Sequence, residues 1–156
     1  LWKYTRLRPE LRLALTGLLE SDDSKCQASG VFAVGEIGDT TKIELLKTLL
    51  DKPNPSESLF RGVPIALAKL NCPVSVSRLV DMLLAEDEKQ AINIAYLSLQ
   101  LNSKILNEEI IKIICDQGIE ARKLAWERFA QCGGFCHVQL ELLAGTTTES
   151  HHLSPN

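Results

Sequence analysis

A cysteine- and histidine-rich segment near the end of the sequence holds the residues best suited to chemistry. Cys132, Cys136 and His137 lie within six positions of one another, and His151 and His152 follow. Thiolates and imidazoles are the usual ligands of structural zinc, which takes four of them in closely spaced pairs. Only one such cysteine pair is present here. We therefore interpret the segment as a loop between helices with incidental cysteines, and metal or redox chemistry stays open as the alternative.

No other residue set indicates catalysis. His137 directly follows Cys136, and successive helix positions do not face each other, so the two make a poor nucleophile–base pair. The Gly-x-Ser-x-Gly, His-Glu-x-x-His and Walker motifs do not occur in the sequence. The acidic pairs Asp22–Asp23 and Glu108–Glu109 are expected at helix starts, where they complement the helix dipole. We expect a protein that is not an enzyme and needs no cofactor.

The composition is that of a globular protein and narrows the class of partner. The chain has 156 residues and a net charge of −3, whereas nucleic-acid binding normally requires a basic surface. We therefore expect no nucleic-acid partner. Five cysteines are an odd number for a disulfide framework and indicate a reducing compartment, so the cytoplasm is the expected location.

The chain is expected to have three parts. Residues 1–8 form a basic arm that contains Lys3, Arg6 and Arg8, residues 9–143 form the folded domain, and residues 144–156 form a flexible tail. The only methionine is Met82, so we expect a module of a larger protein. Membrane contact is expected only through a segment outside this sequence, and the oligomeric state is left open.

Apolar residues recur with the helical period throughout the chain. Leu11, Leu15 and Leu19 illustrate the pattern, which places apolar side chains on one face of a helix. Turn residues divide the chain into helices predicted at 9–20, 24–37, 40–51, 56–70, 75–85, 87–101, 105–116, 119–131 and 136–143. Pro64 either lies inside the fourth of these helices and kinks it, or belongs to the first turn of a helix that starts at Val63.

A small residue ends every second helix at a regular interval. These residues are Gly38, Asn71, Asn102 and Gly133, and they are 33, 31 and 31 positions apart. Glycine and asparagine tolerate the left-handed backbone that commonly ends a helix. The interval predicts a repeated unit of helix, tight turn, helix and short loop.

The first full unit resembles the HEAT-repeat family, especially its short bacterial, phycobilisome-lyase-type form. The segment Val31-Phe32-Ala33-Val34-Gly35-Glu36-Ile37-Gly38-Asp39 resembles the end of that form's first helix, and Leu45 to Pro53 resembles its second helix and turn. The usual Asp-x-x-Val-Arg start of the first helix is degenerate here. The resemblance implies an all-α protein, an α-solenoid of about four HEAT-like helix pairs over 9–143.

The second helix of each pair would line the concave side of such a solenoid. Charged side chains outside the apolar stripes are expected there and form the predicted partner-binding set: Lys42, Glu44, Lys47, Arg78, Asp81, Glu108 and Lys112. Their mixed signs favour a protein or peptide partner, or another domain of the same chain, over nucleic acid. The expected function is a scaffold for protein–protein or interdomain contact. The resemblance also leaves two alternatives, bilin attachment as in phycobilisome lyases and DNA handling as in HEAT-like alkylpurine glycosylases.

Overall fold

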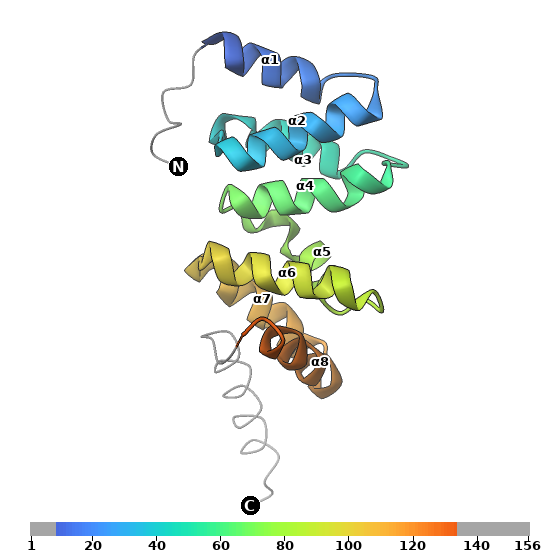
Figure 1. The fold of residues 1–156 in the computed structure, drawn as a ribbon, viewed down its shortest axis with the longest axis vertical. Helices are drawn as coiled ribbons and strands as arrows, with labels where there is room; N and C mark the ends of the chain where they lie inside the picture. The colour runs from blue at the N-terminus through green and yellow to red at the C-terminus, as the bar shows by residue number, and fades with distance from the viewer. Residues whose placement is uncertain (1–8, 134–156) are drawn as a thin grey trace, which may run out of the picture. The chain divides into compact units, whose positions relative to one another are not determined.

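The computed structural model describes residues 9–133, which fold as an all-α structure without a β-strand in that range (Figure 1). Eight α-helices and two short 3₁₀ helices follow one another, each α-helix packing against near neighbours in the chain. Their bounds are α1 Pro9–Leu19, α2 Ser24–Ile37, η2 Thr40–Lys42, α3 Ile43–Leu50, α4 Glu57–Lys69, η3 Pro73–Ser75, α5 Val76–Leu83, α6 Glu88–Leu101, α7 Lys104–Asp116 and α8 Ile119–Ala130. Within residues 9–133 the predicted helices agree with these bounds within about two residues, except that the predicted helix 40–51 begins as η2 and is α-helical only from Ile43. The predicted arm at 1–8, the helix at 136–143 and the tail at 144–156 lie outside the described residues.

Helix starts are fixed by side-chain caps at the predicted turns. Asp23 accepts a hydrogen bond from the Lys25 amide at 2.8 Å at the start of α2. The Ser56 hydroxyl oxygen accepts one from the Leu59 amide at 3.3 Å at the start of α4. Such bonds satisfy amides that have no partner within the helix. Asp87 and Ser103 cap α6 and α7 in the same way.

The four predicted helix-ending residues all have left-handed backbone. Their φ angles are 80° at Gly38, 60° at Asn71, 43° at Asn102 and 109° at Gly133. The other described residues with positive φ are Asn54 and Gly118. The repeated small residue therefore has the local backbone role that its spacing predicted.

Equivalent positions before these residues are buried in all four helices. The residues four positions before them are Val34, Leu67, Ser98 and Phe129, and those eight positions before are Gly30, Val63, Ile94 and Ala125. A separation of four places both positions on one helix face. The same face of α2, α4, α6 and α8 is thus turned to the interior.

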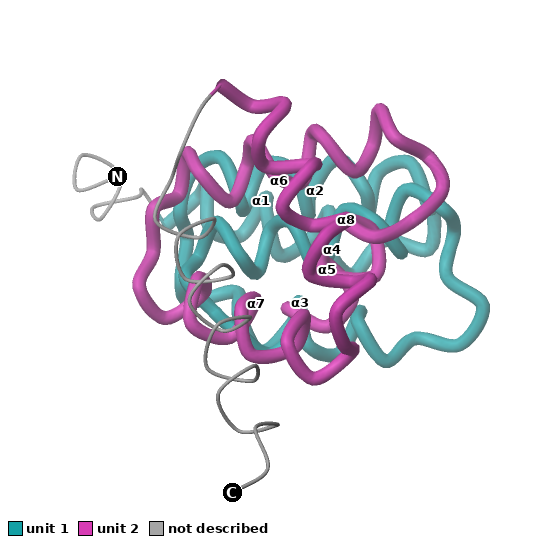
Figure 2. Tube along the Cα trace, turned by 90° about the horizontal axis from the view of Figure 1, so that it is seen from below, with its two compact units in different colours: residues 1–75 teal, residues 76–156 magenta. Residues whose placement is uncertain are grey.

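The chain divides into two compact units, Leu1–Ser75 and Val76–Asn156 (Figure 2). In the first, unit 1, α2 lies between α1 and α4, and α3 packs on α4 (Figure 1). In the second, unit 2, α5 packs on α6 and α7, and α8 packs on α6 and α7.

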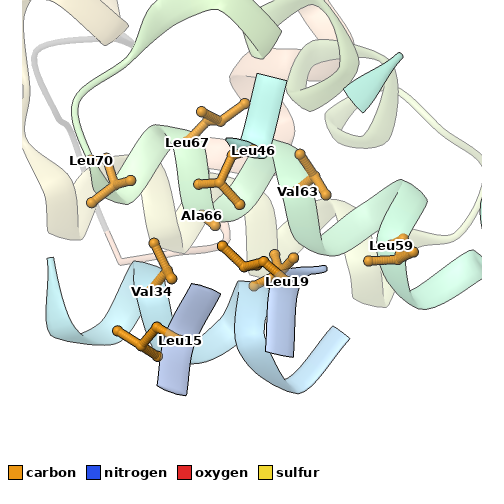
Figure 3. Packing of buried hydrophobic residues seen from close by; sticks show 10 residues of the cluster. Leu15, Leu19, Val34, Leu46, Leu59, Val63, Ala66, Leu67 and Leu70 are labelled. Carbon is orange, nitrogen blue, oxygen red and sulfur yellow. The ribbon is translucent and has the colours of Figure 1, made fainter. Parts of the chain in front are cut away.

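The core of unit 1 is aliphatic. Leu15 and Leu19 of α1, Val34 of α2 and Leu46 of α3 form one buried cluster with residues of α4, and Figure 3 shows Leu15 beside Val34. Burying each such side chain contributes about 1.5–3 kcal/mol, so this cluster is the main source of stability in unit 1. Gln27 is one of the buried polar residues of this unit; it is 5% exposed, donates to the Leu19 carbonyl at 2.7 Å and accepts from Lys52 Nζ at 3.0 Å.

Pro64 is buried and lies inside α4, which begins seven residues earlier at Glu57. The alternative in which a helix starts at Val63 is therefore wrong. Pro64 is accommodated in mid-helix although it cannot donate a backbone hydrogen bond. Its burial shows that its ring serves as part of the apolar face of α4.

Candidate functional site

Three of the predicted partner-binding residues belong to unit 1, and their environments differ. Lys42, at the end of η2, is only 9% exposed, and its ammonium donates to Thr16 Oγ1 of α1 at 2.7 Å. Glu44 and Lys47 lie on α3, one turn apart, and form an ion pair of 3.1 Å. The Glu44 side chain is 85% exposed and the Lys47 side chain 39%. The exposed part of the set in unit 1 is therefore the α3 pair.

The α3 pair changes the acid–base behaviour of its lysine. The hydrogen bond from Lys47 to Glu44, and then the negative charge of Glu44, raise the pKa of Lys47 above the ordinary value of 10.5. Lys47 consequently stays a cation at every physiological pH, and the pair presents adjacent positive and negative groups. An exposed pair of this kind adds little to stability but can orient a charged partner.

The other four predicted residues lie on two neighbouring helices of unit 2. Arg78 and Asp81 are three positions apart on α5, with Arg78 half-buried and Asp81 exposed. Glu108 and Lys112 are four positions apart on α7, and both are exposed. Each of the two helices carries one basic and one acidic residue of the set. Because α5 packs on α7, the four residues lie on adjacent helices. Glu108 also pairs with Lys104 at 3.7 Å, so charges of both signs are interleaved along α7.

The cysteine- and histidine-rich segment is described only as far as Gly133. The Cys132 residue is half-buried, and its Sγ lies 3.6 Å from both the Ile92 and the Arg128 carbonyl oxygens; its one S–H can donate to either, which links the end of α8 to α6. Cys136, His137, His151 and His152 lie outside the described residues. Within residues 9–133 no cluster of three histidine, cysteine or acidic side chains could hold a metal ion.

The acidic pairs have different places in this fold. Asp23 caps α2, as the interpretation of Asp22–Asp23 as a helix start predicted. The expectation for Glu108–Glu109 is wrong, because α7 begins at Lys104 and the pair occupies its second turn. Ser103 caps this helix, and its first turn contains no acidic residue.

Large exposed apolar side chains on the first helices were not among the predicted site residues. Phe32 of α2 is 66% exposed and Tyr96 of α6 is 53% exposed. Each lies six positions before a left-handed residue, so aligning the repeats would have identified them as equivalent. The Lys69 ammonium lies 5.6 Å from the centre of the Phe32 ring and pairs with Glu36, which fixes this part of the α2–α4 surface.

Comparison of the chain with protein-family models, with curated proteins and with solved structures found no match. No helix in residues 9–133 has the length and apolar character needed to span a membrane.

Proposed function

We propose that this chain is a HEAT-like α-solenoid that acts as a non-enzymatic scaffold, binding a protein, a peptide or another domain of its own polypeptide. The observation that carries the proposal is the repeated unit. Asp23 and Ser56 cap their helices 33 residues apart, and the 3₁₀ turns at Thr40 and Pro73 follow at the same interval. Stacked units of this type bury their stripes on neighbours and leave long surfaces for binding.

The charges on the second helices support a protein partner. The helices α3, α5 and α7 each carry both signs, with Glu44 and Lys47 on the first and Glu108 and Lys112 on the last. Alternating signs give complementary contacts with a polypeptide that also carries both. A groove for nucleic acid would be lined with lysine and arginine instead. DNA handling therefore has no supporting observation in the described residues, and neither has bilin attachment.

A cytoplasmic location belongs to the same proposal. Cys26, Cys72, Cys115 and Cys132 are free thiols, all half-buried. Free thiols persist in reducing compartments.

Affinity capture with charge-reversal variants tests the proposed surface. The tagged chain is used to capture partners from an extract of the source cells, with quantification by mass spectrometry. Lys47→Glu and Lys112→Glu, which change residues of α3 and α7, should reduce a specific partner at least about tenfold, as expected when charge complementarity is lost. The control is Lys123→Glu, an equal charge change on α8. Capture that is insensitive to the first two variants would show that the second helices are not the binding surface.

A second pair of variants locates the surface if the first two have no effect. Phe32→Ser and Tyr96→Ser remove the exposed rings of the first helices without changing charge. Aromatic side chains are common energetic centres of protein interfaces. Loss of the partner with these variants alone would support the scaffold function and identify the exposed rings of the first helices as contact residues.

A further inference from the structure

We propose that Arg12, Thr16 and Lys42 form a binding site for an oxyanion, a carboxylate or a phosphate group, that is supplied by the bound partner. The residues come from α1 and η2 of unit 1. This inference rests on the proposed scaffold function and deepens it, because it names the chemical group that the partner must present.

The first observation is a lysine that is almost wholly buried and forms no ion pair with a carboxylate of residues 9–133. Lys42 is 9% exposed, and its Nζ donates to Thr16 Oγ1 at 2.7 Å. The same hydroxyl donates onward to the Arg12 carbonyl at 3.0 Å. Among residues 9–133 no carboxylate oxygen pairs with Lys42, so a neutral hydroxyl is the acceptor of its buried charge. Buried cations in proteins normally have an acidic partner, because removing the charge from water is unfavourable.

The second observation is a guanidinium on the same face of α1. Arg12 lies one helical turn before Thr16, and its side chain is half-buried. Its Nε is shielded from water and has no hydrogen-bond acceptor among the described residues. Arg12 thus shares a helix face with Thr16, Lys42 is hydrogen-bonded to the Thr16 hydroxyl, and neither cation forms an ion pair with a carboxylate of residues 9–133. Like charges placed this way repel each other unless an anion is present.

Three of the other cations of unit 1 have the acidic partner that Lys42 and Arg12 lack among the described residues. Lys47, Arg61 and Lys69 each have an ion pair with a glutamate, although all three are more exposed than Lys42. An oxyanion at Arg12 and Lys42 would supply the missing negative charge. The ammonium offers further N–H donors, and the planar guanidinium can bind two oxygens of a carboxylate or a phosphate at once.

The experiment is a titration of the full ¹⁵N-labelled chain, followed by NMR at constant ionic strength. Inorganic phosphate is the probe in one arm and acetate in the other, so the two arms distinguish a phosphoryl group from a carboxylate. We expect saturable shifts of the Arg12 Nε–H signal and of the Thr16 and Lys42 amides in at least one arm. Arg12→Gln and Lys42→Met should each weaken binding at least about tenfold, as expected for loss of a charge-assisted hydrogen bond.

The matched control is Lys25→Met, which removes one positive charge from an exposed position of α2 in the same unit and should leave the affinity unchanged. Equal weakening by this control, or shifts that never saturate, would reveal general attraction only and overturn the proposal. Arg12 is only half-buried, so Arg12→Gln still tests the site if Lys42→Met fails to fold. Circular dichroism reports which variants are folded.

The anion site and the scaffold function can fail separately. Binding of the free ions needs no partner, so a negative titration removes the anion site and leaves the capture experiment unaffected. Conversely, the ions could bind saturably while Lys47→Glu and Lys112→Glu leave capture of the partner unchanged. That result would support the anion site and contradict the role of the charged second helices in binding.

Discussion

Gly35 of α2 lies directly against the backbone of Ala66 in α4. A β-carbon added to Gly35 would be 3.1 Å from the Ala66 Cα and 3.3 Å from its Cβ. The two helices therefore approach each other as closely as they do because this position has no side chain. Gly30 plays the same part between α2 and α1, where an added β-carbon would be 2.8 Å from the Leu18 Cβ.

Alanine at these glycines should separate the helices. We expect Gly35→Ala to lower the free energy of unfolding by about 1–3 kcal/mol, because overpacking outweighs the gain of up to about 1 kcal/mol in helix propensity. Gly30→Ala should cost more, since its contact is shorter. Urea unfolding followed by circular dichroism measures both. The control is Gly62→Ala in α4, whose added β-carbon would meet Val31 at an ordinary 3.7 Å and should not destabilise. Equal losses at all three positions would contradict the close-approach explanation.

The left-handed helix ends give a second prediction. Gly38→Ala forces a β-carbon onto a residue with φ of 80°, and we expect a loss of about 1–2 kcal/mol. Asn102 already carries a side chain at φ of 43°, so Asn102→Gly should leave stability unchanged or raise it slightly. In thermal unfolding, only Gly38→Ala should therefore lower the midpoint. A higher midpoint for Gly38→Ala would be incompatible with the backbone described for this turn.

The buried Gln27 links three segments of unit 1 and gives a third prediction. Gln27→Leu removes the donor to the Leu19 carbonyl and the acceptor of Lys52, so we expect a loss of about 1–3 kcal/mol in urea unfolding. Lys52→Met removes only the exposed end of the same chain of hydrogen bonds and should cost about 0.5 kcal/mol. The interpretation fails if Lys52→Met proves as costly as Gln27→Leu.

The Glu44–Lys47 pair should make the free energy of unfolding decrease at alkaline pH. The pKa of Lys47 is raised in the folded chain above its ordinary 10.5, so the pair's contribution is fully present below that value. It is lost as the pH rises through the folded pKa, and the raised lysine pKa adds no pH dependence near neutrality. NMR titration of the Lys47 side chain should show the elevated pKa, and Glu44→Gln should return it toward 10.5. An unchanged Lys47 titration in Glu44→Gln would mean that Glu44 is not the cause.

Much of the fold could be predicted because local signals determine it. Caps such as Ser56 and helix-ending residues such as Asn71 act on the chain next to them, so their effects can be read from the sequence. Pro64 left two alternatives open, because its place in α4 depends on the cap at Ser56, which starts the helix earlier.

The environment of the candidate site could be predicted less well, because burial depends on packing between distant segments. Lys42 lies outside every apolar stripe and was expected on a surface, yet η2 places it against Thr16, 26 positions earlier in the chain. Phe32 and Tyr96 show the opposite case, since apolar character alone suggests burial. Their exposure becomes predictable only when the repeated units are aligned with one another.

Gly38 and Asn71 share a backbone conformation but not a side chain, and the caps Asp23 and Ser56 differ in the same way. What is copied from one unit to the next is thus a succession of conformations, which several combinations of residue types can produce. A search based on residue identity would miss copies in other polypeptides that use other residue types. The order of cap and left-handed residue, which α6 repeats with Asp87 and Asn102, would still identify them.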